Sequence, residues 1–260
     1  MEFHTFGNKN NKSVILIHGV LTPWQMWEKQ IDFLKEKFYV VVPALDGHIE
    51  EYASEYISVD DEAEKIEEYV NKELGGTVYA LCGLSMGGAI ANKLFERNKI
   101  VINNLILDGA PLVRISGISN KFMTASYKSI IHKSKSRDKK TLESFSRDFL
   151  PEKFLESYLK FADTMSDRTI ENMIDSVCTS VLTPRENTEN TRILFLHGTK
   201  GNEVYSKRTA NMMKQYYPDM TIKCFNGYKH AELAIYKADE WIEVVESFLA
   251  ADTGMDGGAV

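Results

Sequence analysis

Ser85 lies between two glycines, Gly83 and Gly87, in the stretch YALCGLSMGG (residues 79–88). An apolar run leads into the first glycine, and a helical pattern follows the second. A strand that ends in Gly-x-Ser-x-Gly and passes directly into a helix makes a tight turn that lifts the serine hydroxyl clear of the sheet. The helix start also places backbone N–H groups, notably that of Met86, where an oxyanion would form. The stretch therefore predicts a nucleophilic serine.

Two further stretches offer the partners that such a serine needs. A serine hydroxyl becomes a good nucleophile only when an imidazole takes its proton. His230 is the candidate base, because GYKHAE (227–232) follows the last predicted strand and precedes the final helix. In LIHGV (16–20) a strand ends in His-Gly, and the N–H of Val20 is the expected second oxyanion donor, whereas His18 is expected to brace the loop. The remaining histidines fit the role of base less well by their positions in the chain: His4, His48, His132 and His197.

Short apolar runs alternate with longer helical patterns through most of the chain. The predicted strands cover residues 13–18, 38–45, 77–82, 103–108, 192–197 and 221–226. The predicted helices cover residues 22–37, 58–74, 87–97, 207–217 and 237–250. In the first of these helices we expect Thr22 as the N-cap and Pro23 at the first helical position. Nearly continuous apolar strands spaced by helices predict an α/β fold with a doubly wound, mostly parallel sheet.

Residues 111–190 break this alternation, because they contain helical stretches and no convincing strand. We expect them to form a helical cap inserted into a core of residues 1–110 and 191–250, with a Gly-rich, disordered tail at 251–260. The first third of the cap is basic. This charge run has two interpretations, a solvated surface or a face that attracts an anionic substrate or a membrane. The basic residues are Arg114, Lys121, Lys128, Lys133, Lys135, Arg137, Lys139 and Lys140.

These stretches together resemble the α/β-hydrolase fold family, in its branch of small esterases and peptidases with a helical cap. The resemblance covers nearly the whole chain and is weak in the cap. It implies a Ser-acid-His triad with Ser85 as the nucleophile and His230 as the base. The matching stretches are LIHG, WEKQIDFL, VVPALDGH, GLSMGGAIANKL, LILDGAP, ILFLHGTKGNEV and GYKHAE.

The acid of the implied triad departs from the family pattern. The resemblance assigns this role to the position of Gly201, which carries no carboxylate. Glu203 lies two residues further along in the same loop and has a longer side chain. Asp108 ends an earlier predicted strand, after which some family members keep their acid. The third alternative is that no acid remains.

The composition excludes several classes of protein. The chain has 260 residues, of which 43% are hydrophobic and 26% charged, with a net charge of -6. These values are ordinary for a soluble α/β domain with a cap, and they give no support for nucleic-acid binding. Three widely spaced cysteines predict neither a disulfide framework nor a metal site, and they favour a reducing compartment, hence the cytoplasm: Cys82, Cys178 and Cys224. No apolar run reaches the roughly 18 residues of a membrane span, and the N-terminus lacks the apolar region of a secretory signal.

We therefore expect a cytoplasmic serine hydrolase that cleaves a small or medium ester through an acyl-enzyme on Ser85. Thioester, amide and lactone substrates stay open. The partner is a small acyl substrate, no metal or organic cofactor is implied, and no oligomeric state is indicated. The residues expected around a largely apolar pocket, besides the cap, are Val20, Leu21, Trp24 and Met86.

Two alternatives come from other functional classes. A ligand-binding protein on the same fold, with weak or no catalysis, is favoured by the glycine at position 201. A lyase would use Ser85 and His230 without forming an acyl-enzyme.

Overall fold

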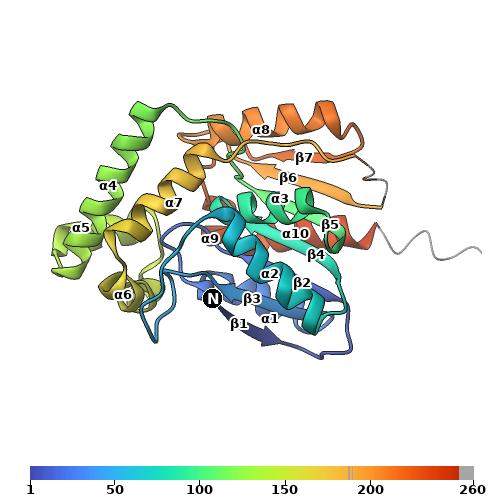
Figure 1. The fold of residues 1–260 in the computed structure, drawn as a ribbon, viewed down its shortest axis with the longest axis horizontal. Helices are drawn as coiled ribbons and strands as arrows, with labels where there is room; N and C mark the ends of the chain where they lie inside the picture. The colour runs from blue at the N-terminus through green and yellow to red at the C-terminus, as the bar shows by residue number, and fades with distance from the viewer. Residues whose placement is uncertain (187, 189, 252–260) are drawn as a thin grey trace, which may run out of the picture.

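The computed structural model describes residues 1–186, 188 and 190–251, and within them seven strands form one sheet (Figure 1). The strand order is β1-β3-β2-β4-β5-β6-β7, with β1 antiparallel to β3 and every other neighbouring pair parallel. This topology confirms the predicted α/β fold. The strands are β1 (Glu2–Phe6), β2 (Ser13–Ile17), β3 (Tyr39–Ala44), β4 (Thr77–Leu84), β5 (Val101–Asp108), β6 (Arg192–His197) and β7 (Thr221–Cys224).

The order of the strands creates a reversal point beside β2. The chain moves outward from β2 to β3, and then returns past β2 to β4. β2 and β4 are therefore neighbours, and Ile17 lies opposite Gly83 in their register. In open α/β sheets, ligands bind at the carboxyl ends of the strands near such a reversal.

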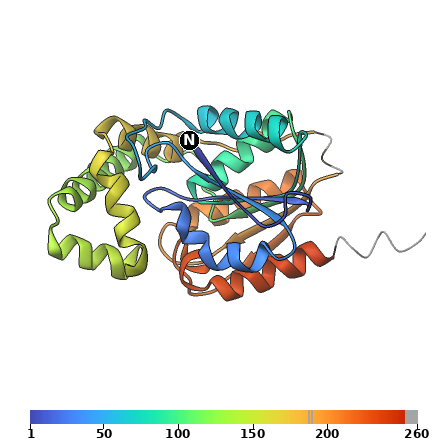
Figure 2. The same cartoon turned by 90° about the horizontal axis from the view of Figure 1, so that it is seen from below.

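Helices cover both faces of the sheet (Figure 2). One face carries α1 (Glu28–Leu34), α9 (Glu232–Tyr236) and α10 (Ala238–Ala250), and the other carries α2 (Val59–Glu73), α3 (Met86–Arg97) and α8 (Glu203–Tyr216). Successive residues of a strand point to opposite faces, so the buried strands contribute to both cores. In β2, for example, Val14 and Leu16 pack on the first face, and Ile15 and Ile17 on the second. This double burial explains why the strands are almost continuously apolar.

Several predicted elements differ from those observed. β1 was not predicted, because it is an edge strand of mostly half-buried residues with few apolar side chains. The predicted helix 22–37 is a short 3-10 helix, η1 (Trp24–Trp27), followed by α1. Thr22 does not cap it, because its hydroxyl exchanges hydrogen bonds with the backbone of Gly19 instead. α8 begins at Glu203 rather than at residue 207.

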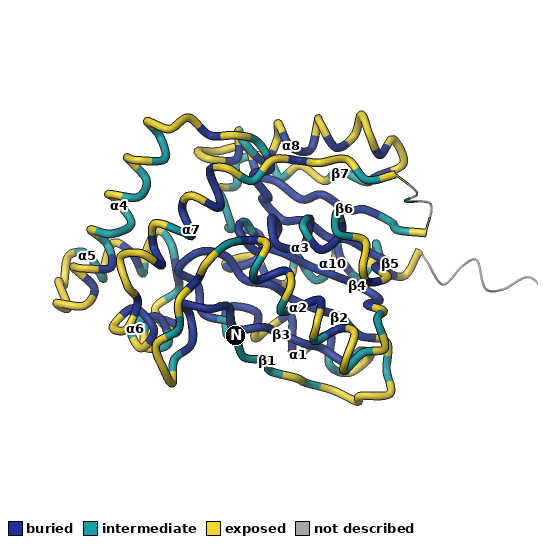
Figure 3. Tube along the Cα trace, in the orientation of Figure 1, coloured by how far each residue is buried: buried dark blue, intermediate teal, exposed yellow. Residues whose placement is uncertain are grey.

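The segment between β5 and β6 is helical and lies beyond the carboxyl ends of the parallel strands (Figure 1). Many of its residues are exposed, whereas the central strands of the sheet are buried (Figure 3). The longest of its helices, α4, was not singled out in the sequence, since its polar and apolar residues are poorly segregated. The elements are α4 (Gly117–Lys135), α5 (Lys139–Asp148), η2 (Glu152–Phe154), α6 (Leu155–Thr164) and α7 (Asp167–Thr179).

Basic residues of this segment bind neighbouring helices. Lys128 Nζ lies 2.5 Å from Glu171 Oε1 of α7, and Lys135 Nζ donates to the carbonyl of Met165 at 2.8 Å. Arg137 makes two hydrogen bonds of 2.7 Å to Asp163 of α6. For these three residues the contacts favour a role in joining the helices over the attraction of an anionic partner.

None of the helices in the described part of the chain combines the length and the apolar character needed to cross a bilayer. The predicted disordered tail, 251–260, lies outside the described residues from position 252 onward.

Candidate active site

Ser85 forms the turn between β4 and α3. Its backbone has φ 55° and ψ −114°, a region that residues other than glycine seldom adopt. The turn is held on one side by a 2.8 Å hydrogen bond from the Ser85 N–H to the carbonyl of Asp108 in β5. The serine hydroxyl thereby stands at the carboxyl end of the sheet.

The flanking glycines are required because backbones pass too close for a side chain. A Cβ atom at Gly83 would overlap the carbonyl of Gly87, and one at Gly87 would overlap the carbonyl of Ile17 in β2. Each overlap involves backbone rather than a flexible side chain, so a larger residue would force the turn open. The glycines thus allow the sharp turn that the sequence predicts.

His230 and Glu203 complete a hydrogen-bonded chain with Ser85. His230 Nε2 lies 2.8 Å from Ser85 Oγ, and His230 Nδ1 lies 2.5 Å from Glu203 Oε1. The His230 side chain is 27% exposed, whereas that of Glu203 is 1% exposed. The imidazole therefore joins an accessible hydroxyl to a buried carboxylate, the order that general-base activation of a serine requires.

The carboxylate next to His230 comes from the first residue of α8. Gly201, the position that the resemblance assigned to the acid, is exposed, and a Cβ atom there would meet nothing within 4 Å. Its φ of 62° belongs to the turn that precedes α8. The turn brings Glu203 inward, where its second oxygen accepts the Gly198 N–H at 2.8 Å. The longer side chain of glutamate reaches the imidazole from this later position.

Asp108, the alternative acid, is not hydrogen-bonded to His230 in the structure. It ends β5, is 5% exposed, and its Oδ2 has no hydrogen-bond partner among the described residues. Burial, together with the nearby charge of Glu203, raises the pKa of Asp108 well above its ordinary value. Such an environment favours the neutral carboxyl group, which is unsuited to stabilising an imidazolium.

The loop after β2 lies directly beside Ser85. A Cβ atom at Gly19 would lie 3.4 Å from Ser85 Cβ, and Val20 follows in the same loop. The Thr22 hydroxyl accepts the Gly19 N–H and donates to the Gly19 carbonyl, both at 3.0 Å. The loop is therefore held in place where the N–H of Val20 was expected to meet an oxyanion.

Two buried histidines stabilise this loop by hydrogen bonds to its backbone. His18 Nε2 accepts the Leu45 N–H at 3.2 Å, so its Nδ1 donates to the Gly19 carbonyl at 2.9 Å. His48 Nε2 accepts the Leu21 N–H at 3.0 Å. The sequence predicted the bracing role of His18. The role of His48 was missed, although its place after a strand at the same sheet edge was a signal.

Burial keeps both bracing histidines neutral. It lowers the pKa of His18 to about 4 and that of His48 well below its ordinary value. The neutral ring suits their contacts, since each Nε2 must accept a backbone N–H, and protonation would turn that nitrogen into a donor.

A cavity of about 440 Å³ opens above Ser85 and His230. Its lining comes from the sheet edge, from the helices α4, α5, α7, α8 and α9, and from the loops after β2, β6 and β7. Thr22, Asn202 and three charged residues are polar exceptions in a mainly apolar wall. The apolar and aromatic lining residues are Val20, Leu84, Pro111, Ile115, Met123, Tyr127, Phe149, Ile174, Val177, Tyr205, Ala231 and Ile235.

Three predicted pocket residues do not line this cavity. Leu21 is 1% exposed and turns into the core with φ 55°. Trp24 stacks on His4 of β1, with ring centroids 4.1 Å apart. Met86 is fully buried beneath the turn, although its N–H belongs to the start of α3. For Leu21 and Trp24 the sequence could not show these directions, because they depend on how the loop after β2 folds back onto β1 and β3.

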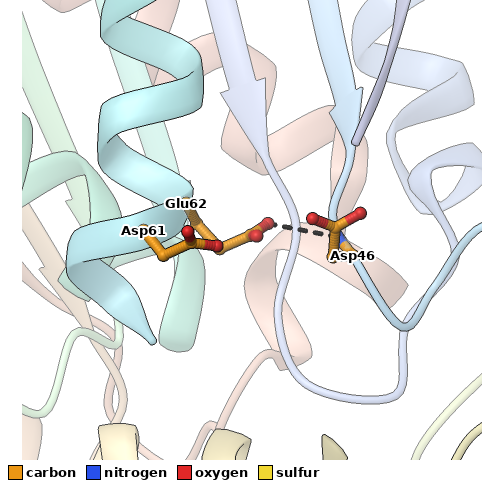
Figure 4. Close-up of side chains that lie close together, drawn as sticks. All are labelled: Asp46, Asp61 and Glu62. Atoms are coloured by element: carbon orange, nitrogen blue, oxygen red, sulfur yellow. Dashed lines mark hydrogen bonds between the residues drawn. The ribbon is translucent and has the colours of Figure 1, made fainter. Parts of the chain in front are cut away.

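Within the described residues, one cluster of carboxylates has the spacing of a cation site: Asp46, Asp61 and Glu62 (Figure 4). Lys65 already lies among these groups, with Nζ 2.5 Å from Asp61 and 3.1 Å from Glu62. Glu62 Oε2 also accepts the Asp46 N–H at 3.1 Å, the contact drawn in Figure 4. Lys65 offsets part of the charge of these carboxylates, and the cluster supports the loop after β3, outside the lining of the cavity.

The sheet order and the serine turn define an α/β-hydrolase fold. The structure is similar to that of an α/β-hydrolase family protein from Desulfitobacterium hafniense, with a TM-score of 0.74 and 20% identity, covering 95% of this chain and 100% of that one. Residues 8–234 match the family described as serine aminopeptidase, S33, and the chain therefore belongs to that α/β-hydrolase family. The resemblance inferred from the sequence motifs is thus confirmed.

Curated relatives match over part of their length. An AB hydrolase superfamily protein from Gibberella zeae is 24% identical over 108 residues, which are 41% of this chain and 38% of the relative. A monoacylglycerol lipase from Xenopus laevis is 27% identical over 117 residues, which are 44% of this chain and 34% of the relative. The chain thus spans little more than a third of either relative.

Proposed function

We propose that this protein is a serine hydrolase that cleaves a carboxylic ester through an acyl-enzyme on Ser85. The observation that carries the proposal is the unbroken chain from Ser85 Oγ through His230 to Glu203, at 2.8 Å and 2.5 Å. A chain of this kind activates the hydroxyl, holds the imidazole in one tautomer and stabilises the imidazolium that forms.

The proposal assigns one group to each step of the reaction. Ser85 Oγ attacks the ester carbonyl carbon while His230 Nε2 takes its proton. The carbonyl oxygen becomes an oxyanion, which the N–H groups of Val20 and Met86 stabilise. The tetrahedral intermediate then collapses, and the imidazolium protonates the departing alcohol. Water, deprotonated by His230, attacks the acyl-enzyme in the same way and releases the acid together with Ser85.

The lining of the cavity supports an ester with an apolar acyl group. Burial of such a group in a cavity of about 440 Å³ with a mainly apolar wall is favourable. Thioesters, lactones and amides would follow the same steps.

An aminopeptidase substrate would also need a carboxylate for its α-ammonium group. The carboxylate among the described lining residues, that of Asp148, is already bound to Arg147 at 2.7 Å. The name of the lipase relative agrees with ester cleavage.

Residues 111–190 form, in this proposal, the cap that closes the cavity and selects its substrate. Ile115, Met123 and Tyr127 support this role, since they line the cavity from α4 and the residues just before it. A reducing compartment, the cytoplasm, belongs to the same proposal, and it is supported by three cysteines that are all free.

A fluorophosphonate probe tests the nucleophile. We expect it to label the wild-type protein and a Ser129→Ala control, which removes an exposed serine of α4, but not Ser85→Ala. Labelling that survives in Ser85→Ala would overturn the assignment. Cys82 would not be the expected alternative, because burial raises its pKa far above the ordinary value of a thiol.

Measurements of turnover distinguish a serine hydrolase from a ligand-binding protein and from a lyase. With 4-nitrophenyl butyrate we expect steady release of nitrophenol and an intact mass increased by one butyryl group during turnover. A burst that stalls would indicate a ligand-binding protein. Steady turnover of another substrate without any acyl-enzyme would indicate a lyase.

A further inference from the structure

Two lysines stand at the mouth of the cavity, on neighbouring loops. Lys200 follows β6, and Lys229 immediately precedes His230. The N–H groups of Thr199 and Lys200 both donate to the carbonyl of Tyr228, at 3.1 Å and 3.0 Å, which ties the two loops together. Both lysines are exposed and both line the cavity. They are therefore held at one side of the opening.

The positive charge of this pair is not cancelled by the carboxylates around it. Neither lysine forms an ion pair with a carboxylate in the described part of the chain. Asp148 also lines the cavity, and its pKa is lowered mainly by its hydrogen bond to Arg147, at 2.7 Å, and in part by the charge of Lys229, so it offsets one lysine at most. Glu232 accepts the backbone N–H of Lys229 at 2.8 Å and does not line the cavity. A net positive charge therefore faces the mouth, although the whole chain carries a net charge of -6.

The proposed reaction indicates which part of a substrate would lie near these lysines. His230 must protonate the departing oxygen, so the leaving group lies on the His230 side of Ser85. Lys229 is the neighbour of His230 in the chain, and Lys200 is tied to the same loop. The apolar wall built by α4 and α7 is left for the acyl group. The basic residues of α4 do not share this role, since none of them lines the cavity.

We propose that the leaving group carries a negative charge, so that the substrate is an ester joining an apolar acid to an alcohol or phenol with a carboxylate or phosphate. This inference rests on the proposed function. A carboxylate or phosphate at the mouth would approach both ammonium groups while its hydration is largely kept. The lysines would thereby favour binding of the anionic ester and hold its oxygen near His230.

Matched esters test this inference. Sodium 4-butyryloxybenzoate has an anionic leaving group, and methyl 4-butyryloxybenzoate has a neutral one with the same acyl chain. We expect the ratio of their kcat/KM values to fall about threefold in Lys200→Gln and in Lys229→Gln, and about tenfold in the double variant, as for unit charges about 6 Å apart in water. Lys207→Gln, on an exposed position of α8, is the control and should leave the ratio unchanged. 4-Butyryloxyphenyl phosphate carries up to two charges, so charge alone predicts about the square of each fall, and a still larger fall would indicate that the site prefers a phosphate.

Salt and a binding measurement complete the test. The preference for the anionic ester should fade toward 1 M salt, where screening acts within about 3 Å. Binding of both esters to Ser85→Ala separates recognition from catalysis. If Ser85→Ala binds the anionic ester more tightly than the neutral one but the wild type hydrolyses neither, the proposed function is wrong and the inferred preference for an anionic ligand stands. Turnover of both esters with a ratio that neither lysine variant alters would overturn the inference alone.

Discussion

Replacement of Glu203 by glutamine should disable the imidazole while leaving its surroundings almost unchanged. Glu203 Oε2 accepts the Gly198 N–H at 2.8 Å, and Oε1 lies 2.5 Å from His230 Nδ1. In Glu203→Gln the amide oxygen must keep facing the Gly198 N–H, because an NH₂ group there would set two donors against each other. The NH₂ group then faces His230 Nδ1. That nitrogen becomes an acceptor, so the ring proton moves to Nε2, which can no longer take the proton of Ser85.

The expected loss follows from this change of tautomer. The equivalent change in a serine protease lowers kcat about 10⁴-fold, a value that belongs to that other enzyme. A loss of about 10³- to 10⁴-fold here corresponds to about 4 to 5.5 kcal/mol of transition-state stabilisation. KM should change little, because Glu203 does not line the cavity that would hold the substrate.

Steady-state hydrolysis of 4-nitrophenyl butyrate measures this effect, and circular dichroism checks the fold. Asp108→Asn is the matched control and should keep kcat within about tenfold, because Asp108 does not contact His230 and its environment favours the neutral group. Gly201→Asp should bring no gain, since His230 Nδ1 already has a carboxylate partner. The reasoning is refuted if Glu203→Gln keeps near-normal kcat while Asp108→Asn loses orders of magnitude.

Three further changes test other parts of the structure. Gly87→Ala should abolish fluorophosphonate labelling and lower the thermal midpoint, whereas Gly117→Ala, at an open position at the start of α4, should do neither. The free energy of unfolding, measured with urea, should fall as pH drops from about 6.5 to about 4, because His18 stays neutral when folded and the unfolded chain binds the proton first. The loss from this residue is on the order of 3 kcal/mol, and His18→Asn should make the slope shallower without removing it, since the buried His48 contributes in the same direction. The last change replaces four basic cap residues by glutamine: Lys133, Lys135, Lys139 and Lys140. This variant should leave the ratio of kcat/KM for anionic and neutral esters unaltered. A lowered ratio would support the interpretation that the basic face attracts an anionic substrate.

Much of the candidate site could be predicted from the sequence because its constraints are local. Gly83 and Gly87 are needed by a turn of five residues, and the apolar run before them needs burial on both faces. Such requirements appear as residue types at fixed spacing, so Ser85, the flanking elements and the parallel sheet were all predictable. His230 could be placed after the last strand for the same reason.

The choice of carboxylate depended on contacts between distant segments. Glu203, Asp108 and an absent acid were open alternatives in the sequence, because each carboxylate follows a strand at the same sheet edge. The choice depends on the turn at Gly201, the Gly198 N–H that orients Glu203, and the loop that carries His230 toward it. Only the folded chain brings these groups within hydrogen-bonding distance.

The residues that line the cavity could not be predicted from the sequence for a similar reason. Leu21 and Trp24 are close to Val20 along the chain, yet the loop after β2 turns them away, one into the core and one onto β1. Lys200 and Lys229 are separated by almost 30 residues, and they meet at the mouth because β6 and β7 are neighbouring strands. Spacing along the chain determines a turn or a strand, whereas the shape and charge of a cavity arise from side chains that only the packing of whole elements brings together.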